Sequence, residues 1–117
     1  MYVVWWIVAS AAISANSATP VGINPLWTAT DYDYEAESYT EQTVTVEAVE
    51  IAHDLPGGVR GWQFVGVIRT EEIARYDTGE TTRTIWWGNE QGKSGEANGQ
   101  SEAISSILGG KPFRLLR

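Results

Sequence analysis

The chain has 117 residues with a hydrophobic fraction of 43%, so it is long enough for one domain with a single core and too hydrophobic for wholesale disorder. It contains no cysteine, which excludes disulfides, thiol catalysis and thiolate metal sites. The net charge is −7, and residues 1–59 contain no lysine or arginine, which disfavours nucleic acids and anionic membranes as partners because both attract clustered positive charge.

The first segment, MYVVWWIV, consists almost entirely of β-branched and aromatic residues. This composition favours a core strand that is buried on both faces. Two other interpretations of residues 1–18 remain open. The small residues after the apolar run are typical of a secretory signal, although no basic residue precedes the run, and a buried helix also fits the pattern. The run is too short to cross a membrane as a helix.

Residues 19–27 are rich in proline, glycine and asparagine, which predicts an extended loop. From Asp31 to Glu37, acidic residues alternate with tyrosine and alanine, the period expected of a half-exposed strand. Between Thr43 and Ala52 the apolar positions change parity. This change predicts a strand with a bulge or bend near Glu47.

The sequence WQFVGVIR predicts a central strand. One face of this strand is expected to carry Trp62, Phe64 and Ile68, and the other Val65 and Val67.

The sequence IARYDTGETTRTIWW predicts a β-hairpin whose second arm ends at Trp86 and Trp87. Its turn is expected at Asp77-Thr78-Gly79, where glycine supplies the positive φ of a tight connection.

The last third of the chain is expected to hold a loop, a helix and a tail. Residues 88–100 contain four glycines and few hydrophobic residues, which predicts a mobile loop. Residues 101–108 predict a short helix with Ser101 as its N-cap and Gly109 as its stop signal. The apolar side chains of the tail, residues 111–117, need to dock on the sheet or on a neighbour to leave water.

Together these elements predict one mainly β domain, residues 1–117, built as an antiparallel sandwich or barrel of five to six strands with one short C-terminal helix. Adjacent residues of a strand point to opposite faces. Within each of the pairs Trp5–Trp6 and Trp86–Trp87, one indole can therefore enter the core, while the other must face outward or face a second layer.

The outward indoles are the strongest functional indication in the sequence. An exposed Trp can anchor a protein interface, stack on a sugar, or be covered by another part of the same chain. We predict binding or interface roles for a set of bulky apolar residues: Trp5, Trp6, Trp86, Trp87, Phe113 and Leu116.

Three motifs approach known signatures but do not satisfy them. GNEQGKS is one residue short of the phosphate-loop spacing. The acidic series lacks the turn glycine and the bidentate glutamate of a calcium-binding EF-hand loop, so a solvated strand face is favoured. His53 beside Asp54 has no accompanying nucleophile, and a single histidine cannot make a multi-histidine metal site. We expect neither a metal nor a cofactor.

The leading hypothesis is a non-catalytic β-domain that acts by association, as a self-assembling or partner-binding structural subunit. The acidic N-terminal half of one copy would pack against the arginine-bearing C-terminal half of another, although two solvated faces of one domain would give the same charge pattern. Small cysteine-free β-rich subunits are common in virus and phage particles, an analogy of type only. The first alternative is a carbohydrate or small-ligand module with a Trp platform. The second, a small enzyme that uses His53 and Asp54, is the least supported.

Overall fold

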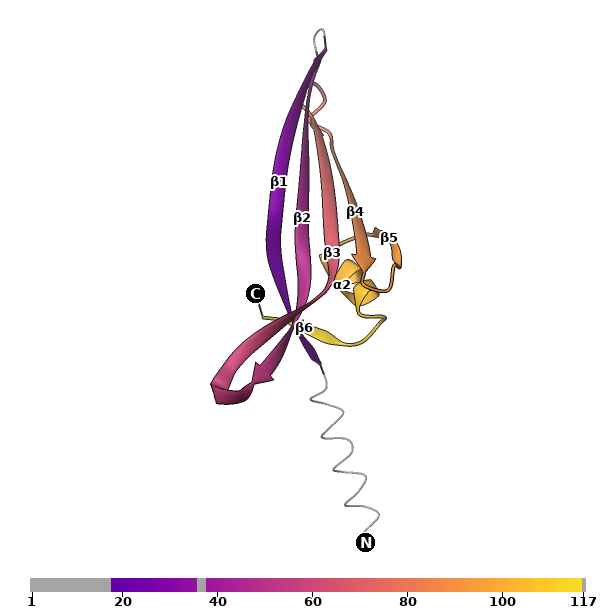
Figure 1. Ribbon diagram of the computed structural model, residues 1–117. Coiled ribbons are helices and arrows are strands. Elements are labelled where there is room, and N and C mark those ends of the chain that lie inside the picture. Colours follow the sequence, from indigo (N-terminus) through magenta and orange to yellow (C-terminus); the bar gives the residue numbers. More distant parts are fainter. Residues whose placement is uncertain (1–17, 36–37, 117) are drawn as a thin grey trace.

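The computed structural model describes residues 18–35 and 38–116. Within these ranges the chain forms six strands, one 3-10 helix and one α-helix (Figure 1). In chain order they are β1 (Thr19–Glu35), β2 (Ser38–Leu55), η1 (Pro56–Gly58), β3 (Val59–Arg75), β4 (Thr81–Asn89), β5 (Ser94–Ala97), α2 (Gln100–Ile107) and β6 (Phe113–Leu115). The predictions for residues 1–17, which include Trp5 and Trp6, lie outside the described residues.

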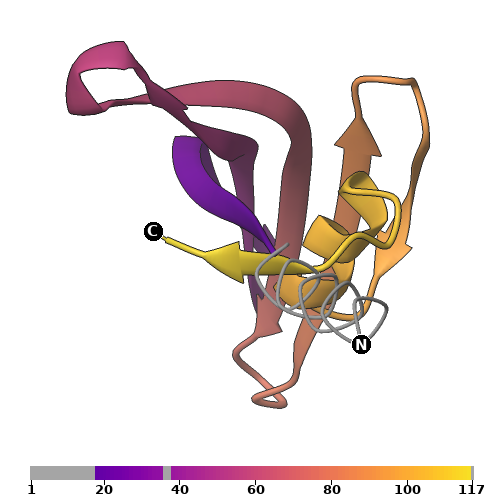
Figure 2. The same cartoon turned by 90° about the horizontal axis from the view of Figure 1, so that it is seen from below.

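The six strands form one sheet in the order β5-β4-β3-β2-β1-β6. Neighbouring strands are antiparallel except β6, which runs parallel to β1. The prediction of a mainly β domain with one short C-terminal helix is confirmed. The sheet is curled into a half-barrel, and its lower part bends around α2 (Figure 2).

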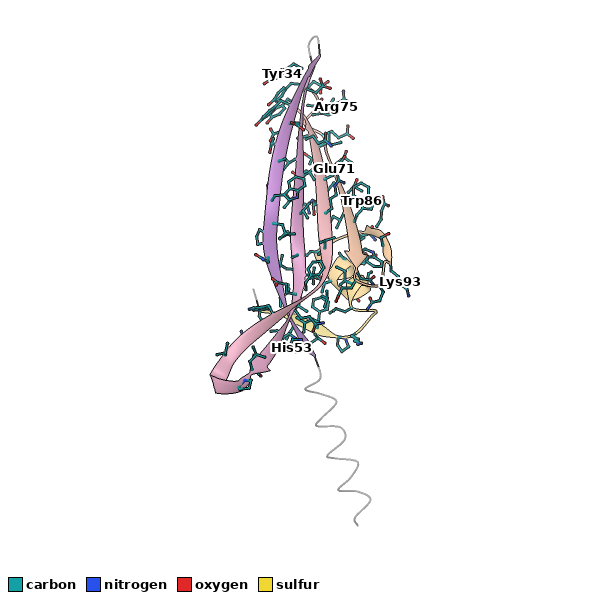
Figure 3. All side chains as sticks on the ribbon, viewed as in Figure 1. Tyr34, His53, Glu71, Arg75, Trp86 and Lys93 are labelled. Atoms are coloured by element: carbon teal, nitrogen blue, oxygen red, sulfur yellow. The ribbon has the colours of Figure 1, made fainter. Side chains whose placement is uncertain are left out.

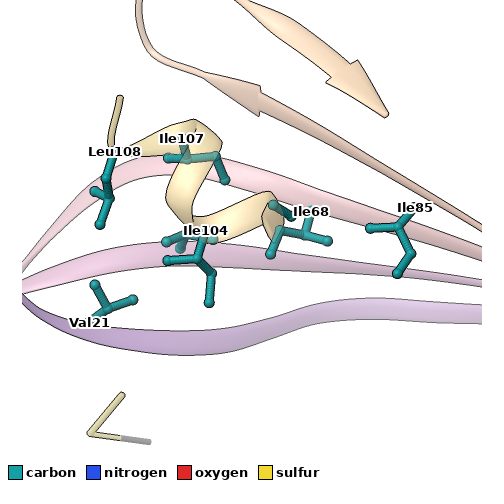
Figure 4. Close-up of a cluster of buried hydrophobic side chains, with 8 residues drawn as sticks. Val21, Ile68, Ile85, Ile104, Ile107 and Leu108 are labelled. Carbon is teal, nitrogen blue, oxygen red and sulfur yellow. The ribbon is translucent and has the colours of Figure 1, made fainter. Parts of the chain in front are cut away.

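The core lies between α2 and the lower part of the sheet (Figure 4). Val21, Val49, Ile68 and Ile104 are at most 1% exposed, and they come from β1, β2, β3 and α2. On α2, Ala103, Ile104 and Ile107 are buried, which is the spacing of one helical face. Full burial of an aliphatic side chain of this size contributes about 1.5–3 kcal/mol. The stability of the fold is therefore concentrated in this lower part.

The helix α2 confirms the predicted helix but begins differently. Gly99 is the N-cap and offers no side-chain hydrogen bond, so Ser101 lies in the first turn and is not the cap that was predicted. The carboxylate of Glu102 accepts a hydrogen bond from the N–H of Asn98 at 3.1 Å, which holds the start of the helix without a hydroxyl cap. No helix in the described part of the chain is long and apolar enough to span a membrane.

The chain leaves α2 at Gly109, which has φ of +68° and ends the helix as predicted. The tail then docks on the sheet of the same chain, because β6 pairs with the first residues of β1. Phe113 packs against the core, and the N–H of Leu116 donates to the carbonyl of Val21 at 2.8 Å.

A β-bulge in β1 bends the sheet at the level where a bend was predicted. Pro25 pairs with Glu47 and Trp27 pairs with Val46, so Leu26 is an extra residue without a partner on β2. The expected irregularity near Glu47 is therefore present, but the extra residue belongs to the neighbouring strand.

A second bulge in β3 overturns one predicted face. Gly66 and Phe64 pair with adjacent residues of β2, so Val65 between them is the extra residue. A bulge reverses the alternation of side chains along its strand. Val65 and Ile68 consequently both face α2, while Trp62 and Phe64 point to the other side. The prediction that Trp62, Phe64 and Ile68 share one face is wrong for this reason.

Residues 19–27, predicted to be a loop, are part of β1. Thr19 and Val21 hydrogen-bond on the β6 side of the strand, away from β2. Pro25 has the same orientation by strand alternation, so its missing N–H removes no ladder hydrogen bond. Pro20 precedes Val21, the first residue of β1 that pairs with β2, so it interrupts no hydrogen bond of that ladder. Neither proline therefore removes a hydrogen bond between β1 and β2.

Residues 88–100, predicted to be a mobile loop, contain the end of β4, a turn, β5 and the first residue of α2. In the turn, Asn89 and Lys93 exchange two hydrogen bonds of 2.9 Å, one of them to Oδ1 of Asn89. Gly95 in β5 lies against the indole of Trp87, where an added Cβ would be 3.2 Å from Nε1. The glycines permit close packing here, which the composition alone did not indicate.

Beyond Ile85, where the pairing of β4 with β5 ends, none of the described elements forms a second layer on the sheet (Figure 1). This upper part, which we call the blade, consists of residues 28–35, 38–45, 70–75 and 81–84. Among the described residues, α2, β5, β6 and the β2–β3 turn all lie below the blade. None of the blade residues whose burial is known is buried. In the described part of the chain, the blade is therefore a sheet without a covering element on either face.

Candidate functional site

Trp86 and Trp87 point to opposite faces of β4, as the alternation of a strand requires. Trp87 packs against the core on the helix side of the sheet. Trp86 lies on the other side, which we call the outer face, with the guanidinium carbon of Arg69 at 5.0 Å from its ring centroid. Arg69 also forms an ion pair with Glu71 at 3.2 Å. These two contacts orient the guanidinium over the indole.

Trp86 belongs to a row of side chains that crosses four strands on the outer face. Trp27 pairs with Val46, Val46 with Arg69, and Arg69 with Trp86. Trp27 is 51% exposed, as is the neighbouring Leu26. Sequence reasoning missed Trp27 because it is a single Trp and not one of a pair. The alternation from Trp27 onward was the signal that could have placed it on an open face.

A tyrosine cluster near the tip of the blade was also missed. The ring of Tyr39 contacts those of Tyr32, Tyr34 and Tyr76, with centroid distances of 5.7, 4.7 and 4.3 Å. The hydroxyl of Tyr76 donates to the carboxylate of Glu41 at 2.7 Å. Figure 3 shows Tyr34 beside the tip. These residues come from two strands and the β3–β4 turn, so no period in the sequence connects all of them.

The tyrosine cluster changes the ionisation of two of its members. Partial burial in the cluster, together with a hydrogen bond to Tyr34, raises the pKa of Tyr39 above its ordinary value of 10.0. The hydrogen bond to Glu41 raises the pKa of Tyr76, because a carboxylate acceptor favours the protonated hydroxyl. Tyr34 is 74% exposed. The cluster is therefore an uncharged aromatic surface at neutral pH, open to contact with a planar group or another protein.

An open groove of about 840 Å³ lies beside the C-terminal end of α2. Trp87 contributes an aromatic wall, and the charged lining residues are Glu90, Lys93 and Lys111. Gln63 and Ser105 are among the polar lining residues. The groove combines a stacking surface with hydrogen-bonding groups, which is the composition expected of a site for a small polar ligand.

His53 lies near the end of β2, on the arm that projects below the helix (Figure 3). Its Nε2 is 2.8 Å from Oε1 of Gln63, so its hydrogen-bond partner is an amide. His53 does not line the groove beside α2, and Asp54 points to the other face of the strand. These positions give no support to the enzyme hypothesis.

The acidic side chains of Asp31 and Asp33 lie on the outer face of β1, and both residues are exposed. Within residues 18–35 and 38–116, no group of three or more histidine, aspartate or glutamate residues is arranged to hold a metal ion. The position of Asp31 and Asp33 on β1 agrees with a role in limiting pairing between two β1 edges, which would bring like charges together.

Of the tail residues predicted as contacts, Phe113 is half-buried against the core and Leu116 is half-buried beside β1. Leu115 between them is 48% exposed. The tail thus contributes to the fold of its own chain, and it does not join Trp86 in one surface because Phe113 lies on the helix side of the sheet.

No protein-family model, curated protein or solved structure matches this chain. The candidate functional surfaces are therefore defined by geometry alone. They are the outer face around Trp27 and Trp86, the tyrosine cluster, and the groove beside Trp87.

Proposed function

We propose that this protein acts by association, as a self-assembling or partner-binding structural subunit. The observation that carries the proposal is the blade, a part of the sheet with no second layer in the described chain. Stable domains are built from at least two packed layers because a sheet must bury one face against another element. A second chain would supply the layer, or the neighbouring strands, that the blade lacks.

The outer face has the composition and the size of a contact surface. Trp27 and Phe64 are 51% and 48% exposed, and Val44, Val46 and Trp86 are half-buried on the same side. β1, β2 and β3 have 17 or 18 residues each, and β4 has nine. At a strand spacing of about 4.8 Å and a rise of about 3.3 Å per residue, these four strands offer about 950 Å². A standard protein interface buries about 800 Å² on each partner, so this one face is large enough for a specific complex.

The experiment that tests this proposal is the molar mass in solution, measured by analytical ultracentrifugation over a wide concentration range. A self-assembling subunit gives a weight-average mass above the 12.9 kDa of one chain, and this mass rises with concentration. A partner-binding subunit stays at 12.9 kDa when it is alone. When the partner binds the outer face, it protects Trp27 from a soluble quencher. A subunit of a virus or phage particle falls within the first case.

The groove beside α2 favours a second candidate function, the binding of a carbohydrate or another small polar ligand. Its support is the indole of Trp87 in the wall, next to amide and hydroxyl groups. This candidate predicts that Trp fluorescence responds to members of a glycan panel and that Trp87→Phe reduces the response. A panel without any response in the wild-type protein would contradict it.

A further inference from the structure

The blade has two open edges, one on β1 and one on β4. β6 pairs with the free edge of β1 only at Thr19–Val21, and β5 pairs with the free edge of β4 only from Ile85 to Gly88. Above these levels, no described strand pairs with either edge. Unpaired edge strands are templates for pairing with another chain.

On β1, the backbone groups of the even-numbered residues face the open edge of the blade. Below the bulge, the N–H of Thr19 donates to Pro112 and the carbonyl of Val21 accepts from Leu116, so odd residues face outward there. The extra residue Leu26 reverses this alternation. Residues 28, 30, 32 and 34 therefore present their N–H and C=O groups to the open side.

On β4, the backbone groups of the odd-numbered residues face the open edge. The N–H of Asn89 donates to Lys93 on the β5 side, whereas the carbonyl of Glu80 accepts from Arg75 on the β3 side. Successive residues of an antiparallel strand alternate between the two sides. Thr81 and Arg83 therefore present free hydrogen-bonding groups outward, above the end of β5.

The two edges fit each other in direction and in level. The four strands of the blade alternate in direction, so β1 and β4 are antiparallel, and a second copy placed beside the first continues the alternation. The pairings across the blade put Thr81 at the level of Tyr32 and Arg83 at the level of Thr30. At this level the outward N–H and C=O groups of Thr30 and Tyr32 in one copy face those of Arg83 and Thr81 in the other. Two such residue pairs can form four backbone hydrogen bonds.

Charge favours this pairing over the symmetric alternative. β1 carries Asp31, Asp33 and Glu35 with no basic residue, whereas β4 carries Arg83 with no acidic residue. Two β1 edges brought together would place the aspartates of both copies on one face, and like charges across a ladder are destabilising. A β1 edge beside a β4 edge instead sets Asp31 opposite Thr82, a neutral hydroxyl donor.

We propose that the open β1 edge of one copy pairs with the open β4 edge of a second copy, so that the sheet continues from chain to chain in a head-to-tail manner. This inference rests on the proposed function and names the partner as the chain itself. β5 and β6 separate the copies below the blade, so pairing is confined to residues 29–32 and 81–84 and neighbouring copies splay apart. A repeated rotation of this kind gives a ring or a helical array, in contrast to a dimer.

The first test blocks each edge separately with proline. Arg83→Pro and Thr30→Pro each remove an outward N–H without removing a ladder hydrogen bond inside the chain. Alone, each variant is expected to be monomeric, with association weakened at least about ten-fold. Mixed together, the two variants are expected to form a heterodimer that grows no further, because one intact edge of each kind remains.

The second test uses charge and keeps the backbone unchanged. Thr82→Asp places a carboxylate opposite Asp31 of the next copy and is expected to weaken association about five-fold. Thr82→Asn, which is uncharged, is the matched control and is expected to leave association unchanged. Adding Asp31→Lys to Thr82→Asp is expected to restore association, because opposite charges then face each other.

The outcomes separate this inference from the function on which it rests. If the wild type associates and both proline variants and Thr82→Asp associate equally well, the edge pairing is wrong while association stands. If Arg83→Pro still dimerises and Thr30→Pro does not, the symmetric β1–β1 pairing replaces it. If the wild-type protein is monomeric at all concentrations and no partner protects Trp27, the proposed function itself fails.

Discussion

The lower part of this molecule and the blade are built from the same strands, yet they are stabilised in different ways. In the lower part, α2 covers one face of the sheet and closes a core of aliphatic side chains. In the blade, the strands continue for several residues beyond any covering element of the described chain, and none of the blade residues whose burial is known is buried. The difference shows that packing of the core in the lower part stabilises the fold, whereas the blade extends from it as exposed sheet.

A single-layer sheet loses conformational entropy on folding and gains little burial in return, unless another chain packs on it. Ordering the backbone of one residue costs about 1–2 kcal/mol, and the blade recovers little of this through burial. It keeps its strands in register through ladder hydrogen bonds, the tyrosine cluster and surface ion pairs such as Arg83 with Glu72 at 3.4 Å. We infer that contacts with other chains supply the remaining stabilisation.

The largest expected effect is the loss of a core side chain in the lower part. Ile104 is 0% exposed, and Ile104→Ala is expected to lower the free energy of unfolding by about 3 kcal/mol. Ile73 in the blade is half-buried, and Ile73→Ala in the monomer is expected to cost about 1 kcal/mol or less. Urea unfolding followed by circular dichroism measures both. Equal losses would contradict the contrast between the two parts.

The next effect concerns the close contact between β3, β4 and α2. A Cβ at Gly66 would overlap the carbonyl oxygen of Gly88 and lie 2.9 Å from Cγ2 of Ile107. Gly66→Ala is expected to lower the free energy of unfolding by about 2 kcal/mol. Gly88→Ala is the control, since its nearest contact would be 3.9 Å. If thermal unfolding is unchanged by Gly66→Ala, the helix does not pack as closely as described.

Removal of the exposed indole from the outer face tests the contact surface directly. For a complex formed through the outer face, Trp27→Ala is expected to raise the dissociation constant at least about ten-fold, because large aromatic side chains dominate interface energies. Stability of the monomer should stay within about 0.5 kcal/mol. Leu115→Ala, at a similarly exposed position on β6, is the matched control. Equal effects of the two substitutions on sedimentation would exclude a specific role for Trp27.

The smallest effect is the pH dependence of the tyrosine cluster. Tyr39 and Tyr76 have a raised pKa in the folded protein, whereas their unfolded value is near 10.0. Their contribution to stability is therefore complete below pH 10 and is lost as the pH rises above it, because the unfolded state releases these protons first. Ultraviolet absorption should show late-ionising tyrosines, and Tyr76→Phe should remove one of them. A single transition near pH 10 for all tyrosines would contradict the cluster.

Sequence patterns predicted the elements of this fold better than its faces. The hairpin at Gly79, the helix after residue 99 and the division of Trp86 from Trp87 followed from local chemistry: a positive φ, apolar spacing and strand alternation. The faces of β3 did not follow, since the bulge at Val65 depends on pairing with a distant strand. Single residues can reverse a face in this way, and periodicity alone does not reveal them.

The candidate site was predictable only in part, and for a similar reason. Trp86 was predicted as a contact residue because it forms a pair with Trp87. Trp27 and Arg69 lie in the same row as Trp86 because of the strand order, which no pattern in the sequence specifies. Residues 19–27 were assigned to a loop because proline usually interrupts strands, but Pro20 precedes the residues that pair with β2, and the nitrogen of Pro25 points away from β2. The tyrosine cluster likewise depends on strands that meet at the tip.

The most direct test of the central claim, that association completes the blade, is amide hydrogen exchange at increasing protein concentration. Between about 1 µM and about 1 mM, exchange at residues 28–34 and 81–84 is expected to slow at least about ten-fold, while the protected amides around Ile68 stay unchanged. Exchange in the blade that is independent of concentration, in a protein that remains at 12.9 kDa, would contradict self-association.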